Sequence, residues 1–351
     1  MNLLLFNLAV DADDPLLSFG LTWIARLAAH FERIDVLTMR AGRVVVPTNV
    51  TVHSIGKERG LSEPARAVVF YRRLAALLHA RRYSACFAHM MPLFVAMGAP
   101  LLAAARIPIT LWYTHRSAGW SLRAALPACR RVVTAAADSF PIPTPKLRVL
   151  GHGIDTDFFA PNEAISPIER RVVHVARLMP IKHQATLLRA VAQIAGAEAY
   201  LVGAIPPQQD HSYREHLERL AQELGAADRI HFAGALPPEG VRAAYWEAAA
   251  AVNLSPPGLF DKAALESMAA AVPTIVSSPA FAPLLSGHEA RLLIPAPDDA
   301  DALAERLRAL FALDRPTRVA VGADLRARVC AEHSLDALIP RLVRVLITGE
   351  P

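Results

Sequence analysis

Short apolar runs alternate with amphipathic segments along the whole chain. The first half holds runs of strand character at residues 3–10, 33–38, 50–55, 85–88, 108–113, 131–134 and 146–150. Between them, apolar residues recur at helical spacing in residues 16–31 and 64–80. Strands that alternate with amphipathic helices predict a parallel sheet covered by helices.

A second series of the same kind begins at Arg171. It predicts strands at 172–176, 199–202, 230–232, 250–254, 273–277 and 292–294, and helices around 187–191 and at 212–224, 238–248, 302–311, 317–329 and 334–347. The two series predict two Rossmann-like, doubly wound α/β domains at residues 1–150 and 171–330, joined by a connector at 151–170. For the last helix, within 331–351, packing back toward the N-terminal domain is one option.

Composition agrees with two folded cores. The chain has 351 residues, of which 53% are hydrophobic and 20% are charged, so it is globular rather than disordered. Its three cysteines lie far apart and suggest neither a disulfide framework nor a metal site: Cys86, Cys129 and Cys330. We therefore expect a reducing, cytoplasmic compartment. No basic segment precedes the first apolar run, so no signal peptide is expected.

One stretch has nearly the length and composition of a transmembrane helix. Residues 84–105 contain no Asp, Glu, Lys or Arg. Pro92, Gly98 and Pro100 interrupt this stretch, which favours a buried strand followed by a short core helix.

Charge is distributed unevenly between the two halves. Residues 1–160 hold 18 Lys and Arg against 10 Asp and Glu, whereas the remainder holds 19 against 22. The basic half is expected to meet an acidic partner, either an anionic membrane at its inner face or an anionic polymer, and the arginines of segment 64–82 are its most concentrated part. A solvated surface is the alternative, and a nucleic acid partner is not expected.

The stretch from Ser255 to Pro273 carries the strongest candidate chemistry. A Pro-Pro-Gly turn is followed by a short helix, with Asp261 placed to cap it and Lys262 in its first turn. Because a helix N-terminus already carries partial positive charge, a lysine there favours an anionic ligand. Glu266 lies one turn further on, and an ordinary salt bridge with Lys262 is the alternative.

Two further cations follow a strand in the same half. Arg177 and Lys182 lie between the strand at 172–176 and the next helix. An arginine fork and a mobile lysine beside a helix N-terminus suit a diphosphate, although either residue alone would be an ordinary surface cation. In the first half, His89 and His115 each end a strand, where an open α/β sheet delivers residues to a site.

These residues together resemble a known family. Four segments, in the family's order, resemble a family-4 retaining glycosyltransferase with the GT-B fold: Gly153-Ile-Asp155-Thr-Asp157-Phe, Val-Ala-Arg177-Leu-Met-Pro-Ile-Lys182, Ile230-His-Phe232-Ala-Gly234 and Leu265-Glu266-Ser-Met268-Ala269-Ala-Ala-Val-Pro273. The resemblance covers nearly the whole length. It implies two Rossmann-like domains facing across a cleft, with C-terminal helices, a nucleoside-diphosphate sugar as donor and a glycan, lipid-linked molecule or small molecule as acceptor.

The resemblance also implies roles for individual residues. The diphosphate is expected on Arg177 and Lys182, the ribose on Glu266, and His115 near the transferred sugar. The remaining donor-side candidates are Gly234, Leu259, Phe260, Asp261 and Lys262, and the weaker acceptor-side candidates are Ser18, Gly20 and His89. Because the basic clamp neutralises the phosphates, we expect no metal and no cofactor.

Two departures from the family pattern leave alternatives open. Gly258 stands eight residues before Glu266, where the family has its first glutamate, and the glycine-rich N-terminal loop is reduced to Ser18-Phe19-Gly20. A catalytically silent nucleotide-sugar or anionic-glycan binding protein is therefore the alternative function. A dinucleotide-dependent oxidoreductase is disfavoured because no complete G-x-G-x-x-G follows a strand, and hydrolases lack a nucleophile or metal motif.

Overall fold

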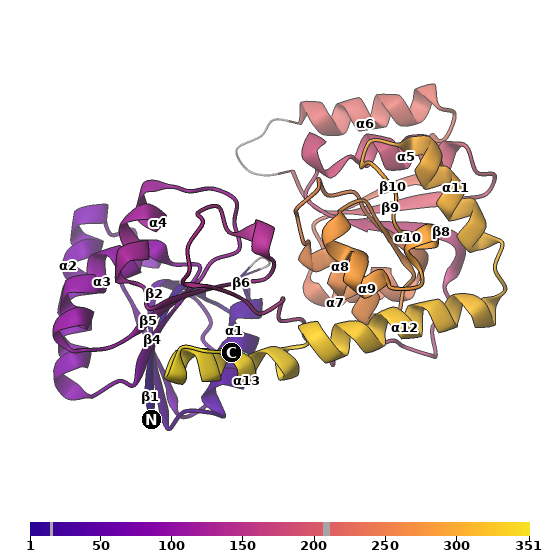
Figure 1. The fold of residues 1–351 in the computed structure, drawn as a ribbon. Helices are drawn as coiled ribbons and strands as arrows, with labels where there is room; N and C mark the ends of the chain where they lie inside the picture. The colour runs from indigo at the N-terminus through magenta and orange to yellow at the C-terminus, as the bar shows by residue number, and fades with distance from the viewer. Residues whose placement is uncertain (15–16, 206–210) are drawn as a thin grey trace. The chain divides into compact units, whose positions relative to one another are not determined.

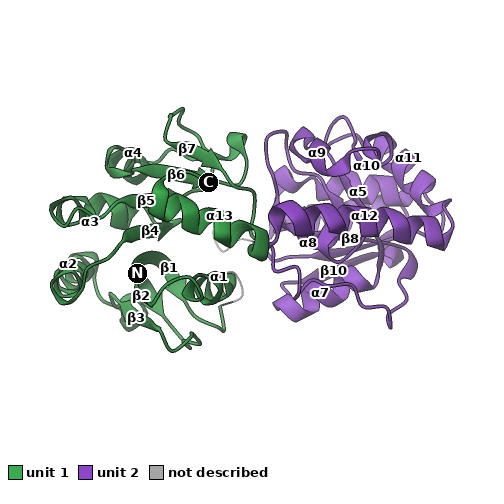
Figure 2. Ribbon diagram, turned by 60° about the horizontal axis from the view of Figure 1, so that its bottom comes forward, with its two compact units in different colours: residues 1–153, 335–351 green, residues 154–334 purple. Residues whose placement is uncertain are grey.

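The computed structural model describes residues 1–14, 17–205 and 211–351, which divide into two compact units. The first unit comprises residues 1–153 and 335–351, and the second comprises residues 154–334 (Figure 1, Figure 2). Each unit is a parallel sheet with helices on its faces, as the alternating pattern predicts.

The first unit contains a seven-stranded parallel sheet in the order β3-β2-β1-β4-β5-β6-β7. Its strands are β1 (Asn2–Val10), β2 (Arg33–Ala41), β3 (Val50–Ser54), β4 (Ala85–His89), β5 (Ile109–Trp112), β6 (Arg131–Thr134) and β7 (Leu147–Val149). Its helices are α1 (Phe19–Ala28), α2 (Glu63–Ala80), α3 (Pro92–Ala104), α4 (Trp120–Ala125) and α13 (Leu335–Thr348).

Two apolar cores lie on opposite faces of this sheet. Along β1, Leu3 and Leu5 point into the core shared with α1 and α13, whereas Leu4 and Phe6 point into the core shared with α2, α3 and α4. Because successive side chains of a strand alternate between faces, a strand covered on both sides must be apolar throughout. The continuous apolar run at the start of the sequence has this cause.

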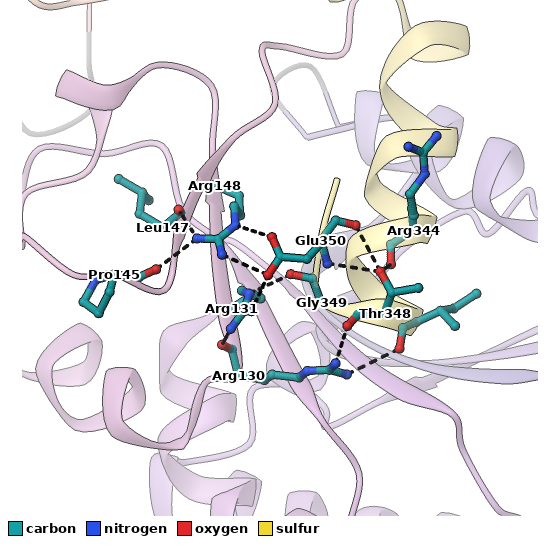
Figure 3. A network of polar contacts seen from close by, with 10 residues as sticks. Arg130, Arg131, Pro145, Leu147, Arg148, Arg344, Thr348, Gly349 and Glu350 are labelled. Atoms are coloured by element: carbon teal, nitrogen blue, oxygen red, sulfur yellow. Dashed lines mark hydrogen bonds and ion pairs between the residues drawn. The ribbon is translucent and has the colours of Figure 1, made fainter.

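The end of the chain is bound to the first unit by arginines from β6, β7 and the residue before β6. Glu350 accepts hydrogen bonds from Arg131 at 2.6 Å and from Arg148 at 3.0 Å, and Arg130 donates to the carbonyls of residues 347 and 348 (Figure 3). Leu338 and Leu342 of α13 are fully buried in the same core as Trp23. The last helix is therefore an integral part of the first unit.

The second unit contains a five-stranded parallel sheet in the order β10-β9-β8-β11-β12. Its strands are β8 (Ile168–Val175), β9 (Glu198–Val202), β10 (Ile230–Gly234), β11 (Ala248–Asn253) and β12 (Thr274–Val276). Its helices are α5 (Gln184–Ala192), α6 (Ser212–Glu223), α7 (Pro238–Trp246), α8 (Lys262–Ala269), α9 (Ala282–Leu285), α10 (Glu289–Leu292), α11 (Ala300–Phe311) and α12 (Arg315–His333).

Several predicted elements differ from the structure in their bounds or type, and three of them bear on the fold. The strand expected at 292–294 is wrong, because Glu289–Leu292 is helical and Leu293 makes only an isolated bridge to Val276. The helix expected at 238–248 ends at Trp246, since the alanines that follow form β11 in the sheet. The helix expected at 16–31 begins at Phe19 and ends at Ala28, and residue 16 lies outside the described residues.

Candidate functional site

In the second sheet, the side on which successive strands are added changes between β8 and β11, although all strands are parallel. Strands β8, β9 and β10 follow one another to one side, and β11 then returns to pair with β8 on the other. Ligands of open α/β sheets bind at such a switch point, beyond the carboxyl ends of the strands. The loops after β8 and β11 therefore define the candidate site, and they carry most of the residues predicted from the sequence.

The loop after β8 has a fixed backbone and an exposed cation. Gly203, at the end of β9, has φ +149°, and a Cβ on it would lie 2.0 Å from the Ala176 carbonyl oxygen, so only glycine permits this approach. The Gln184 side chain donates to the Arg177 carbonyl at 2.9 Å. The Arg177 guanidinium itself is exposed and makes no ion pair with the described residues.

The loop after β11 contains a preformed turn. The Leu259 N–H donates to the Pro256 carbonyl at 3.1 Å, and Gly258 has φ +80°. Pro257 and Gly258 thus occupy the two central positions that a type II turn favours for proline and glycine. Phe260 anchors the end of the loop, since it is buried and its ring centroid lies 4.5 Å from that of Phe281.

Lys182 and Asp261 bring the two loops together. Lys182 Nζ contacts the Asp261 carboxylate and lies 3.1 Å from Ser255 Oγ. The prediction that Asp261 caps α8 is wrong for its side chain, because it occupies the N-cap position without accepting a hydrogen bond from the helix. Its Oδ2 instead accepts hydrogen bonds from Lys182 Nζ, from Ser255 Oγ and, at 3.3 Å, from Asn253 Nδ2.

The Asp261 carboxylate is ionised in this setting. Burial raises the pKa of Asp261, but the positive charge of Lys182 and the hydrogen bonds from Lys182, Ser255 and Asn253 outweigh this effect. The pKa of the carboxyl therefore lies below its usual value, and the two loops are joined by a charge-assisted contact.

Lys262 and Glu266 form the ion pair that their spacing allows. Lys262 Nζ lies 3.0 Å from Glu266 Oε1 on the first turns of α8. The helix itself is held from both ends: the Tyr245 hydroxyl donates to the Ala263 carbonyl at 3.0 Å, and Arg326 of α12 donates to the Ala269 carbonyl. Gly322 lets α12 approach, because a Cβ there would lie 1.9 Å from the Ala271 carbonyl oxygen.

Three residues of this site were not predicted from the sequence: His174, Asn253 and Ser255. His174 is buried in β8, and burial, with the nearby charge of Lys182, lowers its pKa to about 4. His174 Nδ1, Asn253 Oδ1 and Ser278 Oγ are buried without hydrogen-bond partners among the described residues. Buried polar atoms without a partner are uncommon in folded proteins, and these three lie at or near the ends of neighbouring strands of the second sheet. The sequence signal that could have identified these residues was a polar residue near the end of an apolar run.

The predicted residues of the first unit lie at the end of β4, in the loop after β5 and at the start of α1. His115 is exposed, and its Nδ1 accepts from the Ser117 N–H at 3.0 Å, which leaves Nε2 to carry the proton. His89 is buried, with its ring stacked at 4.7 Å on Trp23. Ser18 precedes α1, and Gly20 lies in α1 where a Cβ would come within 3.3 Å of Asn7.

Other predicted features are simpler to place. Gly234 ends β10 with φ +71°, and its carbonyl accepts from the Gly203 N–H at 2.8 Å. Within the described residues, no three His, Cys, Asp or Glu side chains are grouped as metal ligands would be. Among the same residues, no helix has both the length and the apolar character needed to cross a membrane.

A family model matches part of the second unit. Residues 169–312 match the family model described as Glycosyl transferases group 1. The matched segment contains both loops of the candidate site, with Arg177, Lys182, Asp261 and Glu266.

A curated relative of the chain points to the same activity class. The GDP-mannose-dependent alpha-(1-6)-phosphatidylinositol monomannoside mannosyltransferase of Mycobacterium tuberculosis is 29% identical over 293 residues, which cover 72% of this chain and 73% of the relative. Together with the match to the Glycosyl transferases group 1 model, this similarity indicates a glycosyltransferase.

Solved structures confirm the predicted fold class. HepE from Anabaena, in complex with UDP, has a TM-score of 0.77 at 16% identity and covers 99% of this chain and 100% of its own. Sucrose-phosphate synthase from Thermosynechococcus elongatus has a TM-score of 0.76 at 20% identity, with full coverage of both chains. The chain thus has the GT-B fold, built from two parallel-sheet α/β units.

Proposed function

We propose that the chain transfers a sugar from a nucleoside-diphosphate sugar to a hydroxyl of an acceptor, with retention of configuration and without a metal. The observation that carries this proposal is the placement of Arg177 and Lys182 on the loop after β8, at the switch point of the sheet. A diphosphate bound there meets two cations and the N-terminal ends of helices. Glu266, on the neighbouring α8, would accept hydrogen bonds from the ribose.

The chemistry follows from where charge develops. The bond between the sugar C1 and the diphosphate oxygen breaks, and its electron pair goes to that oxygen. Arg177 and Lys182 would stabilise the charge that grows on the leaving group. The acceptor oxygen forms the new bond to C1 on the same face, and its proton goes to the departing phosphate. His115 is proposed to donate a hydrogen bond from Nε2 to the transferred sugar.

The relatives suggest which donors to test first. The mycobacterial relative is named for GDP-mannose and a phosphatidylinositol mannoside, and HepE has been solved with UDP. We therefore propose a GDP- or UDP-linked hexose as donor and a glycan or lipid-linked molecule as acceptor.

Nucleotide binding tests the proposal directly. Binding of GDP, UDP and ADP is measured by thermal shift and calorimetry on the wild type and on Arg177→Ala and Lys182→Ala. We expect one nucleotide to stabilise the wild type and each variant to lose most of that shift. Arg189→Ala is the matched control, because Arg189 is an exposed cation on α5 outside the loop. If no nucleotide stabilises the wild type, the proposed donor site is wrong.

A catalytically silent binding protein is the second candidate, and Gly258 supports it. At φ +80° this position disfavours the glutamate of the family pattern. The silent protein would show the same nucleotide-dependent shift but neither transfer nor slow hydrolysis with any nucleotide sugar. Product analysis with GDP-mannose and UDP-glucose separates the two functions.

We also propose that α2 contacts an anionic membrane at the inner face. Val68 is 58% exposed and Tyr71 is 44% exposed on this helix, beside the exposed Arg72 and Arg73. No acidic residue follows Glu63 in α2, and Val68, Tyr71 and Arg72 share one helix face because they lie at i, i+3 and i+4. Sedimentation with phosphatidylglycerol vesicles should capture the wild type but not Arg72→Glu/Arg73→Glu. A variant with the same charge change in the other unit, Arg219→Glu/Arg315→Glu, should bind as the wild type does.

A further inference from the structure

Lys182 is paired with a carboxylate at the position where it would meet a phosphate. Its Nζ contacts Asp261 Oδ2 and Ser255 Oγ, and the same Oδ2 accepts from Ser255 and Asn253. The Lys182 side chain is only 14% exposed and that of Asp261 29%. Water and salt therefore screen this pair less than they screen a surface pair.

The contact fixes both partners. Asp261 follows the turn at Gly258 and precedes α8, and its carboxylate is turned away from the helix N-terminus toward Lys182. Lys182 ends a short 3-10 turn at Pro180–Lys182, so the backbone limits the reach of its side chain. The ammonium group is consequently held at one place, between the loops after β8 and β11.

The carboxylate also places a negative charge beside a bound diphosphate. A free nucleoside diphosphate carries roughly one more negative charge near pH 7 than its sugar conjugate, because a terminal phosphate oxygen ionises with a pKa of about 6. Repulsion by Asp261 therefore acts more strongly on the product than on the donor.

We propose that Asp261 is a positioning residue that orients Lys182 and, through its charge, weakens binding of the product nucleoside diphosphate relative to the donor. The inference rests on the proposed function of the same site. Its consequence is faster release of the nucleoside diphosphate after transfer, since the carboxylate offsets part of the attraction from Lys182 and Arg177.

Asp261→Asn tests the inference, because it removes the charge and keeps an oxygen for Lys182. Affinities for the nucleoside diphosphate and for its sugar conjugate are measured by calorimetry at low salt. We expect the diphosphate to bind on the order of tenfold more tightly, with a smaller gain for the sugar conjugate, so that the ratio of the two affinities changes. Asp261→Glu, which restores the charge, should bring the ratio back toward that of the wild type.

Glu198→Gln is the matched control. Glu198 begins β9 and pairs with Arg171 at the amino end of the same sheet, so its substitution changes the net charge equally but away from the site. Its affinity ratio should equal that of the wild type. If Asp261→Asn does not fold, Asp261→Ala replaces it. The affinity ratio should then change in the same direction, in favour of the nucleoside diphosphate.

The outcomes separate this inference from the proposed function. If the wild type binds no nucleoside diphosphate, the proposed function itself fails. If the wild type binds it and loss of the Asp261 charge leaves the affinity ratio unchanged or lowers it, Asp261 does not set the balance between donor and product, and the inference is overturned.

Discussion

Lys262 Nζ lies 3.0 Å from Glu266 Oε1, one turn along α8. Glu266 is the carboxylate proposed to bind the ribose. In the proposed complex, this carboxylate would therefore contact both Lys262 and the ribose hydroxyls. The pairing orients the Glu266 carboxylate before the donor arrives, which suits a group that accepts hydrogen bonds from hydroxyls.

Glu266→Gln should therefore weaken nucleotide binding by about tenfold, the effect of losing a charge-assisted hydrogen bond. The loss should be larger for a ribonucleoside diphosphate than for its 2′-deoxy analogue, as measured by calorimetry. Glu305→Gln is the control, because Glu305 is exposed and pairs with Arg306 outside the site. Equal losses for the two nucleotides would show that Glu266 does not contact the ribose.

Substitution of Gly258 by any residue with a side chain should destabilise the protein. At φ +80° an alanine is strained, and we expect Gly258→Ala to lower the free energy of unfolding by about 1 kcal/mol in urea denaturation. Gly119→Ala is the control, because Gly119 has φ −62° and open space where a Cβ would be. If the two variants have equal stability, the turn at Pro256–Leu259 does not need glycine.

His174 should make stability depend on pH. Its pKa is lowered to about 4 in the folded protein by burial, with Lys182 adding to the effect, from an ordinary value of 6.5. Between these pH values His174 is protonated in the unfolded chain but neutral in the folded protein. The free energy of unfolding is therefore highest above pH 6.5 and falls as the pH decreases toward 4. The loss attributable to His174 is at most about 3 kcal/mol.

Urea unfolding at pH 7 and pH 5 measures this dependence. Lys182 and Asp261 also face His174, so both remain unchanged in the comparison. A His174→Gln variant should lose less stability between the two pH values than the wild type loses. His79→Gln, at an exposed position on α2, should behave as the wild type does. The idea fails if His174→Gln keeps the full pH dependence.

Glu350 should hold the end of the chain on β6 and β7. The hydrogen bonds from Arg148 and Arg131 lower the pKa of Glu350 to about 2, so the contacts with both arginines persist at all ordinary pH values (Figure 3). Glu350→Gln should speed hydrogen exchange of the Gly349 amide, which donates to the Val345 carbonyl at 2.9 Å. Glu305→Gln is again the control, and unchanged exchange at Gly349 would exclude the anchoring role.

Much of the fold could be predicted from local pattern. The apolar run of β1 and the alternation of strands with amphipathic helices predict parallel sheets covered on both faces, since burial on two sides demands such runs. The strand expected at 292–294 was wrong because a short apolar run is also compatible with the end of a helix.

The candidate site could be predicted only in part. Arg177 and Lys182 were recognisable because cations follow a strand, and the Pro-Pro-Gly turn because proline and glycine have fixed backbone preferences. His174, Asn253 and Ser255 were missed, since a polar residue at a strand end has no distinguishing spacing. The expected cap by Asp261 failed because a distant lysine binds its carboxylate more strongly than the helix N-terminus does.

The sequence by itself determined the two α/β units, the turn at Gly258 and the ion-pair spacing of Lys262 and Glu266, because these depend on periodicity and on neighbours within one turn. Only the tertiary structure decided that Lys182 meets Asp261, 79 positions along the chain. That contact exists because the sheet order places β8 beside β11 and so brings their following loops to one edge. No local pattern encodes which strands become neighbours.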